Sequence, residues 1–161
     1  VLGRKLAALT RPGERVGVLL PTVAALPVVI FGLNARGRVP AMLNFTAGPK
    51  NLRAACEVAG LSTILTSRRF VEQGKLEDVV AAIETGRRVV YLEDVRATIT
   101  SLDKIYGLTE SWRAGMIARS SGLKPDDPGV LLFTSGSEGA PKAVVLSNAN
   151  ILANAGQIAQ H

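Results

Sequence analysis

The sequence predicts an α/β fold in which a largely parallel sheet is flanked by helices. Between residues 15 and 92, short aliphatic runs alternate with longer helical segments, and turn residues separate them. This alternation is typical of right-handed βαβ units, whose strands are covered on both faces. With 161 residues, 47% of them hydrophobic, the chain can form one core or part of a larger domain. We expect the second, because it begins with Val1 and stops at His161 soon after its most distinctive loop.

Strands are expected where runs of aliphatic residues are bounded by turn residues. These runs cover residues 15–20, 39–43, 61–66, 87–92, 130–133 and 143–146. Helices are expected over residues 4–9, 23–35, 49–59, 67–74, 76–84, 98–107, 111–120 and 148–160. Pro49 in a first turn, Gly60 after a last turn and Ser147 as an N-cap support three of these boundaries.

The stretch from residue 16 to residue 35 carries no charge and is nominally long enough to cross a bilayer. Its prolines and glycines, Gly17, Pro21, Pro27 and Gly32, argue against a membrane-spanning helix. We therefore interpret the stretch as a buried strand followed by an apolar helix, both covered within an α/β domain.

The net charge of +6 would permit a nucleic-acid partner, but the 19 basic residues are scattered as singles and pairs. Aromatic residues make up only 4% of the chain, which leaves no platform on which bases could stack. No nucleic-acid partner is therefore expected. The charge indicates a solvated surface, and an acidic protein partner would also suit it.

The single cysteine and the single histidine are not expected to carry chemistry. Cys56 cannot form an internal disulfide, which suggests a reducing compartment. It is in phase with Leu52, Ala55 and Ala59 on one helical face, so a buried structural thiol is favoured over a nucleophile. His161 has no ligand or carboxylate beside it in the sequence, and we assign it no role.

The chain is organised around residues 130–146, where two predicted strands flank a polar segment. Hydroxyl groups are offered by Thr134, Ser135 and Ser137, and Lys142 supplies a cation. Glycines at 136 and 139 allow positive φ angles and close approach of the backbone to a ligand. Such a loop can surround a polyphosphate with backbone N–H groups and hydroxyls. The alternative is a glycine-rich surface hairpin without a ligand.

The spacing excludes the nucleotide-hydrolase loop G-x-x-x-x-G-K-[ST]. The interval from Gly136 to Gly139 is too short, and Ala143 stands where that loop requires a magnesium-binding hydroxyl. A β-branched run follows Lys142, where a helix should begin. The segment is therefore a different kind of phosphate loop.

These residues resemble the signature of the adenylate-forming synthetases, [FY]-T-S-G-[ST]-T-G-x-P-K-G-V. The match runs from Phe133 to Val144 with two departures, Glu138 for threonine and Ala143 for glycine. The variant SGSEG, with VGVLLP, GRVPAMLNFTAG and LTSRRFVE upstream, is similar to one branch of this superfamily. That branch is the acyl-acyl-carrier-protein synthetase half of the bifunctional 2-acylglycerophosphoethanolamine acyltransferases.

The resemblance implies a fragment of the large N-terminal AMP-binding domain, with a scaffold over residues 1–124 and the phosphate hairpin with its following helix over 125–161. It implies an ATP-dependent acid-thiol ligase that uses Mg²⁺ and activates a fatty acid as acyl-AMP. An acyl carrier protein, or coenzyme A, would take the acyl group, and a fused domain could pass it to a lysophospholipid. The implied ATP phosphate-binding residues are Thr134, Ser135, Gly136, Ser137, Glu138, Gly139 and Lys142.

The resemblance also implies what this chain lacks. The adenine, magnesium and ribose motifs of the superfamily and its adenylation lysine lie downstream, so no catalytic residue is assigned here and the fragment alone is expected to be inactive. The parent protein is expected on the cytoplasmic side and associated with the inner membrane. The alternatives are an acyl-CoA synthetase of the same superfamily and a non-catalytic basic binding module.

Three further residues or motifs need separate treatment. Residues 106–110 spell Y-G-x-T-E, another signature of the superfamily, but they precede the phosphate loop instead of following it, so we reject this match in favour of one helix ending near Gly107 and a second beginning at Ser111. Asn148 stands where much of the superfamily has histidine, and no pocket role is carried over to it. Glu138 would repel a phosphate, at a cost of about 4 kcal/mol at 4 Å, unless it points away, meets magnesium or pairs with a cation.

Overall fold

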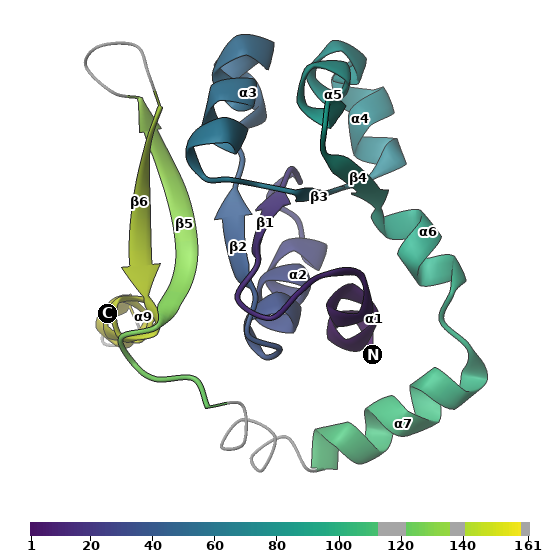
Figure 1. Cartoon of the computed structure of the whole chain (residues 1–161). Helices are drawn as coiled ribbons and strands as arrows, with labels where there is room; N and C mark the ends of the chain where they lie inside the picture. Colours follow the sequence, from purple (N-terminus) through teal and green to yellow (C-terminus); the bar gives the residue numbers. More distant parts are fainter. Residues whose placement is uncertain (113–121, 136–140, 159–161) are drawn as a thin grey trace.

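The computed structural model describes residues 1–112, 122–135 and 141–158. It contains a six-stranded sheet with the order β4-β3-β1-β2-β5-β6 (Figure 1). The five strands from β4 to β5 are parallel, and β6 is antiparallel to β5. The predicted α/β class is confirmed. The strands are β1 (Arg15–Val18), β2 (Val39–Met42), β3 (Thr63–Thr66), β4 (Arg88–Tyr91), β5 (Pro128–Ser135) and β6 (Pro141–Ser147).

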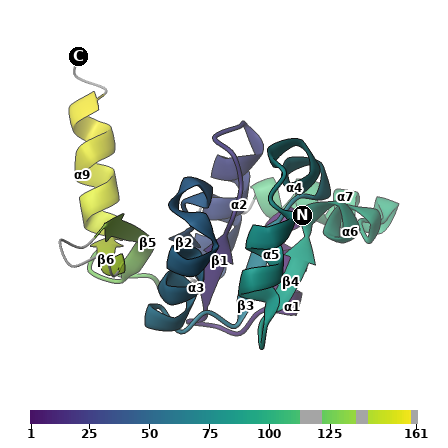
Figure 2. The same cartoon turned by 90° about the horizontal axis from the view of Figure 1, so that it is seen from above.

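Helices cover both faces of the parallel strands. One layer holds α3, α4 and α5, and the other holds α1, α2 and α6. The last helix, α9, contacts the β5–β6 hairpin and projects away from the other helices in Figure 2. The helices are α1 (Leu2–Leu9), α2 (Ala25–Asn34), α3 (Gly48–Val58), α4 (Arg68–Gly74), α5 (Glu77–Glu84), α6 (Leu92–Ala97), α7 (Ser101–Trp112) and α9 (Asn148–Ile158), with a 3-10 turn η1 (Phe45–Ala47).

The core has two parts because successive residues of each strand face opposite sides of the sheet. In β3, Ile64 packs with the α3 and α5 side chains, and the next residue, Leu65, packs with those of α1 and α2. Cys56 is fully buried in the first part, as expected, and burial raises the pKa of its thiol. Burial of β1 on both sides from residue 16 to residue 18 explains why this part of the strand needs no charge. The expected cover of the following helix is not observed in the described residues, because α2 buries only Val29 and Leu33 and leaves Val28 and Phe31 more than half exposed.

The uncharged stretch from residue 16 to residue 35 consists of β1 followed by α2, as predicted. Within the described residues, no helix has the length and apolar character required to cross a membrane. Two predicted helix ends are also confirmed. Pro49 lies in the first turn of α3, and Gly60 follows the end of that helix with a φ of +63°.

Arg38 connects the start of β2 to the end of α1. It is 8% exposed, and its Nη2 donates to the carbonyl groups of Ala7 at 2.9 Å and Thr10 at 2.7 Å. Its Nε donates to Thr10 Oγ1 at 3.1 Å, and its Nη1 donates to the carbonyl group of Arg36. The last carbonyl groups of a helix have no partner within the helix, so this buried cation supplies their donors and opposes the negative end of the helix dipole.

The region between β4 and β5 differs from the prediction. Helices were expected over residues 98–107 and 111–120 with a break at Gly107, but α7 runs through Gly107 from Ser101 to Trp112. It begins late because Asp103 and Thr100 form reciprocal N-terminal hydrogen bonds. Gly107 is not a break: a Cβ there would lie 2.3 Å from Val1 Cγ2, so glycine allows the helix to pack on the N-terminus. Helix α6 was missed, and most of the expected second helix lies outside the described residues.

Replacing Arg38 with methionine should lower the free energy of unfolding by about 2–4 kcal/mol, because buried carbonyl groups would lose their donors. The matched control is Arg53→Met, since Arg53 pairs with Glu57 at 3.1 Å while both side chains are 56% exposed. That change should cost less than about 0.5 kcal/mol. Urea denaturation followed by circular dichroism measures both. Equal losses in the two variants would show that Arg38 is not a structural cap.

Asp103 should make the stability of the chain depend on acid pH. Hydrogen bonds from Lys5, from Thr100 and from Arg4 hold the pKa of this carboxyl well below its usual range. Because the folded pKa is the lower one, the stabilisation is complete above the unfolded pKa of about 3.9 and is lost as the pH falls through the folded pKa.

We therefore expect Asp103→Asn to be less stable than the wild type at neutral pH, with the difference narrowing as the pH is lowered from about 5 toward 2. Urea midpoints measured at several pH values provide the comparison. A difference that stays constant over this range would mean that Asp103 stabilises the fold by packing and not by its charge.

Candidate functional site

The described ends of the predicted phosphate loop face each other across the β5–β6 hairpin. Thr134 pairs with Lys142 in the antiparallel ladder, and Ser135 pairs with Pro141. Residues directly opposite in such a ladder have their side chains on the same face. Thr134 and Lys142 are both exposed. The hairpin therefore brings a hydroxyl and an ammonium group together, although they are eight positions apart in the sequence.

The remaining predicted residues of the loop, Gly136, Ser137, Glu138 and Gly139, lie outside the described residues. Their predicted contacts with phosphate therefore stay predictions. Ser135 and Pro141, which border this segment, are paired in the β5–β6 ladder. The segment therefore starts and ends at the same end of the hairpin.

This end of the hairpin lies at the carboxyl edge of the parallel strands. Asn44 follows β2 at this edge, and Ser67 follows β3. The N-terminal ends of α3 and α4 lie there too, because each follows a parallel strand. Ligands of open α/β sheets bind at this edge, where backbone N–H groups and the positive ends of helix dipoles favour anions.

A cavity of about 400 Å³ lies between the hairpin and the η1–α3 segment at the same edge. Phe133, Thr134 and Pro141 contribute to it from the hairpin. Both apolar and amide side chains line the opposite side, namely Asn44, Ala47, Asn51, Leu52 and Ala55. A mixed lining of this kind can hold an apolar group and orient a polar one beside it.

The two amides in this cavity are held in place by local hydrogen bonds. Asn44 Oδ1 accepts from the backbone N–H group of Thr46 at 3.0 Å and from its hydroxyl at 2.8 Å. Asn51 Nδ2 donates to the carbonyl group of Ala47 at 2.9 Å. These bonds leave the amide nitrogen of Asn44 and the amide oxygen of Asn51 for other partners. The sequence analysis did not identify either residue. The signal for Asn44 was an amide directly after a predicted buried strand, whereas Asn51 lies within α3 and gave no such signal.

The N-terminus of α4 is already occupied by a carboxylate. Glu93 accepts from Ser67 Oγ at 2.7 Å and from the backbone N–H group of Arg68 at 3.1 Å. Partial burial acts to raise the pKa of Glu93, but these hydrogen bonds outweigh it and lower the pKa. Arg68 also pairs with Asp94 at 2.6 Å and stacks over the Tyr91 ring at 4.0 Å. This group therefore stabilises the fold, and the candidate site lies at the hairpin instead.

The other end of the hairpin is fixed by the turn before β5 and the first turn of α9. The carbonyl group of Asp127 accepts from the backbone of Asn148 at 3.1 Å, and that of Pro125 accepts from Ala149 at 2.8 Å. Ser147 caps α9, as predicted, by accepting from the backbone of Asn150 at 3.3 Å. These bonds hold the entry to β5 beside the exit from β6.

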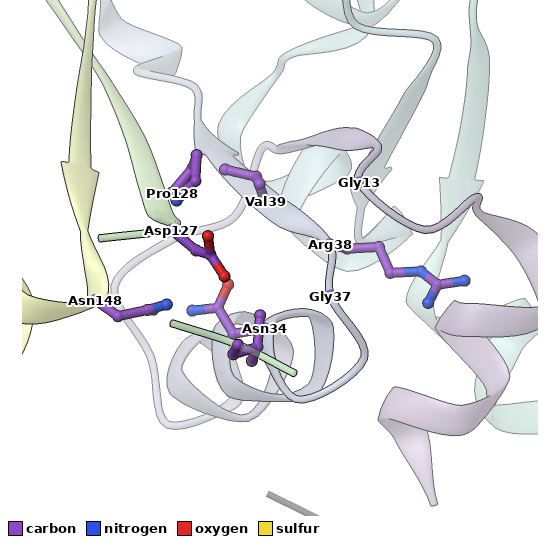
Figure 3. A pocket seen from close by; sticks show the side chains of 9 residues that line it. Gly13, Asn34, Gly37, Arg38, Val39, Asp127, Pro128 and Asn148 are labelled. Atoms are coloured by element: carbon purple, nitrogen blue, oxygen red, sulfur yellow. The ribbon is translucent and has the colours of Figure 1, made fainter. Parts of the chain in front are cut away.

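A second cavity, of about 230 Å³, lies beside this base at the amino edge of the sheet. Figure 3 shows that the side chains of Asn34, Asp127 and Asn148 point toward one another across it, while Arg38 points away. Among the described residues, Asn34 Oδ1 is buried without a hydrogen-bond partner. Asn148 Nδ2 donates to the carbonyl group of Lys124 at 3.2 Å. Asn148 thus supports the base of the hairpin and lies at the edge opposite the phosphate loop.

The motif Y-G-x-T-E lies within α7, although the predicted helices left residues 108–110 between them. Glu110 pairs with Arg36 at 2.8 Å, and the guanidinium group of Arg4 lies 5.4 Å from the centre of the Tyr106 ring. Glu110 therefore connects α7 to the turn after α2, and Tyr106 connects α7 to α1. Across the described residues, no group of three or more His, Cys, Asp or Glu residues could bind a metal ion.

The fold defines an α/β protein whose parallel sheet ends in the antiparallel β5–β6 hairpin. Residues 3–161 match the AMP-binding enzyme family, and the chain belongs to this family. It is 27% identical over 151 residues to 4-coumarate–CoA ligase 2 of Oryza sativa subsp. japonica, a match that covers 90% of this chain. It is 25% identical over 168 residues to a long-chain-fatty-acid–CoA ligase of Escherichia coli O6:H1, which covers 92% of this chain.

A solved structure shows the same fold. The o-succinylbenzoate CoA synthetase of Bacillus subtilis, in complex with its acyl-adenylate intermediate, aligns with 99% of this chain at a TM-score of 0.72 and 17% identity. The chain spans 26% of the rice ligase, 30% of the bacterial ligase and 36% of this solved chain. The predicted architecture, part of the N-terminal domain of an adenylate-forming enzyme, is confirmed.

Gly129 should be essential for the base of the hairpin. A Cβ at this position would lie 2.6 Å from Ile151 Cδ1, 2.8 Å from Asn148 Oδ1 and 3.2 Å from the backbone nitrogen of Asn148, so Gly129→Ala requires both side chains to move and presses on the first turn of α9. We expect a loss of about 1–3 kcal/mol in the free energy of unfolding. Gly156→Ala, in the same helix, meets nothing within 4 Å and should stabilise the chain by about 0.5–1 kcal/mol. Thermal unfolding measures the midpoint temperature of each variant. A shift of both midpoints in the same direction would refute the packing argument for Gly129.

Proposed function

We propose that the protein of which this chain forms the phosphate-binding part is an ATP-dependent ligase that activates a carboxylate as an acyl adenylate. The observation that carries the proposal is the β5–β6 hairpin, which sets Thr134 opposite Lys142 at the carboxyl edge beside the larger cavity. The family of the chain and the acyl-adenylate complex of the Bacillus subtilis relative support it.

In this reaction, a carboxylate oxygen attacks the α-phosphorus of ATP, and pyrophosphate leaves with the electrons of the broken P–O bond. Catalysis depends mainly on positioning the reactants and on neutralising charge on phosphate oxygens. The ammonium group of Lys142 and the hydroxyl group of Thr134 would bind oxygens of the departing pyrophosphate. Ser135, Gly136, Ser137 and Gly139 would add hydroxyl and backbone N–H donors. Mg²⁺, which would arrive with ATP, supplies further neutralisation of phosphate charge.

We further propose a fatty acid as the carboxylate. The mixed lining of the larger cavity, with Phe133 and Leu52 beside Asn44 and Asn51, suits an apolar chain with a polar end. One curated relative is named a long-chain-fatty-acid–CoA ligase, which supports the same substrate class. The thiol acceptor has two candidates. The resemblance of SGSEG and the upstream segments VGVLLP, GRVPAMLNFTAG and LTSRRFVE to the acyl-carrier-protein synthetase branch favours a carrier protein, with a lysophospholipid as the final acceptor in a fused acyltransferase. The CoA ligases among the relatives favour coenzyme A.

The test is exchange of labelled pyrophosphate into ATP by the full-length protein in the presence of fatty acids of different length. Exchange that requires a fatty acid is expected, and its absence with every acid would refute the proposal in favour of a non-catalytic binding module. Product formation with holo carrier protein and with coenzyme A then identifies the acceptor. The chain of 161 residues alone should not catalyse exchange.

Lys142→Ala should weaken binding of Mg·ATP to the full-length protein roughly ten- to hundred-fold, because a charge-assisted hydrogen bond of about 1.5–3 kcal/mol is lost. Lys75→Asn is the matched control: it removes one positive charge at a position whose φ of 49° asparagine tolerates. Isothermal titration calorimetry measures both. Equal weakening by the two changes would indicate a general charge effect and no contact between Lys142 and phosphate.

A further inference from the structure

A β-bulge lies at the base of the hairpin, where β5 begins. Pro128 pairs with Ser147 and Val130 pairs with Leu146, so Gly129 is one extra residue on β5. A bulge bends the strand that carries it and increases the local twist. The direction in which the β5–β6 hairpin leaves the sheet is therefore set at Gly129.

The neighbouring scaffold strand does little to fix this direction. In the part of the chain that the structure describes, Ala41 and Leu131 are the one pair in register between β2 and β5. Beyond this pair, β5 continues to Ser135 along the side of the larger cavity. The orientation of the outer half of the hairpin is therefore determined mainly at its base.

Asn148 connects this base to the segment that enters β5. Its Nδ2 donates to the carbonyl group of Lys124 at 3.2 Å, and its backbone N–H group donates to that of Asp127 at 3.1 Å. Lys124 and Asp127 also bond to each other. The backbone N–H group of Asp127 donates to the carbonyl group of Lys124 at 3.1 Å, and that of Lys124 donates to Asp127 Oδ2 at 2.7 Å. Asn148 is thus bonded to a turn that is itself closed by hydrogen bonds.

The same side chain covers the bulge. Gly129 is buried, and a Cβ on it would lie 2.8 Å from Asn148 Oδ1. Figure 3 shows the side chain of Asn148 directed toward Asn34 and Asp127 across the cavity of about 230 Å³. Truncation of this side chain would remove the donor to Lys124 and enlarge the space beside the bulge, so the bulge would be free to bend to a different degree.

We propose that Asn148 is a positioning residue for phosphate binding. By covering the bulge at Gly129, it holds the hairpin in the direction that places Thr134 and Lys142 beside the larger cavity. Asn148 lies at the amino edge and bonds to the turn before β5, so it acts through the hairpin and does not touch the ligand. The inference rests on the proposed function, because that function assigns phosphate binding to Thr134 and Lys142.

The first test is fatty-acid-dependent pyrophosphate exchange by variants of the full-length protein. Asn148→Ala should raise the KM for ATP about ten-fold, since a displacement of a binding group by about 1 Å can cost up to about a hundred-fold. Asn148→His retains an N–H donor, and the cavity of about 230 Å³ leaves room for the ring. Its KM for ATP should therefore be close to that of the wild type.

The matched control is Asn150→Ala, the same change in the same turn of α9. Asn150 Oδ1 accepts from the backbone N–H group and from the hydroxyl group of Ser147, both at 3.0 Å, so these bonds stay within the start of the helix. Both alanine variants should lower the thermal midpoint to a similar extent. The KM for ATP should stay unchanged in Asn150→Ala. Equal increases of this KM in the two variants would overturn the proposal, because a general loosening of α9 would then explain both.

A distance measurement without ATP or fatty acid tests the direction of the hairpin itself. Nitroxide labels on Glu72→Cys in α4 and Val144→Cys in β6 report this direction by double electron–electron resonance. Both native side chains are exposed, whereas Cys56 is fully buried and should stay unlabelled. Asn148→Ala should shift or broaden the distribution of distances between the labels, and Asn150→Ala should not.

The two measurements separate this inference from the proposed function. Identical distance distributions for the wild type and Asn148→Ala would overturn the positioning role. A shifted distribution in Asn148→Ala, together with no exchange by the wild type with any fatty acid, would refute the ligase while supporting control of the hairpin direction by Asn148.

Discussion

The parallel direction of five strands is the constraint on which the rest of the structure depends. Because each of the strands β1 to β4 is followed by a helix, helix C-termini collect at the amino edge of the sheet and helix N-termini at the carboxyl edge. The two edges therefore differ in electrostatic character before any side chain is considered. Arginines at the amino edge supply donors to helix carbonyl groups: Arg38 to α1, Arg15 to the end of α3 and Arg87 to the end of α5. The carboxyl edge keeps its N–H groups for carboxylates and ligands.

The need for donors to helix carbonyl groups at the amino edge explains the basic composition of the chain better than a polyanionic partner does. Arg88 donates to the carbonyl group of Leu9, and Arg15 to that of Ala59, so much of the positive charge is used within the fold. Such an arginine is difficult to recognise from the sequence, because its partner lies tens of residues away and is a backbone group. The scatter of basic residues along the chain argued against a nucleic-acid site but could not reveal what the arginines do within the fold.

The sequence was sufficient where a local pattern decides the structure. Apolar periodicity located β1 to β4, and the capping residues Pro49, Gly60 and Ser147 located helix ends, because these features depend on neighbours within one or two turns. The motif predicted Thr134 and Lys142 in the segment between the two strands, whereas the structure pairs them within the β5–β6 ladder. The failures came from tertiary contacts: Gly107 was taken for a helix break although it serves a close approach to Val1, and the cavity amides Asn44 and Asn51 gained significance only once η1 and α3 were seen beside the hairpin.

The cavity between the hairpin and α3 exists because β5 pairs with β2 over only a short length. Only Ala41 and Leu131 are in register between β2 and β5 in the described residues, whereas β5 and β6 pair along almost their whole length. Leu131 is buried in the core, but Leu132 and Val144 remain exposed, so the core ends within the hairpin. Continuing the ladder to the end of β5 would bring the hairpin closer to α3 and fill the space that Phe133 and Asn51 now line. A binding site at this edge therefore requires that the pairing between β2 and β5 end before the carboxyl edge. The hydrogen bond between Asp127 and Asn148 at the opposite end fixes the base of the hairpin and so compensates for the missing β2–β5 pairs.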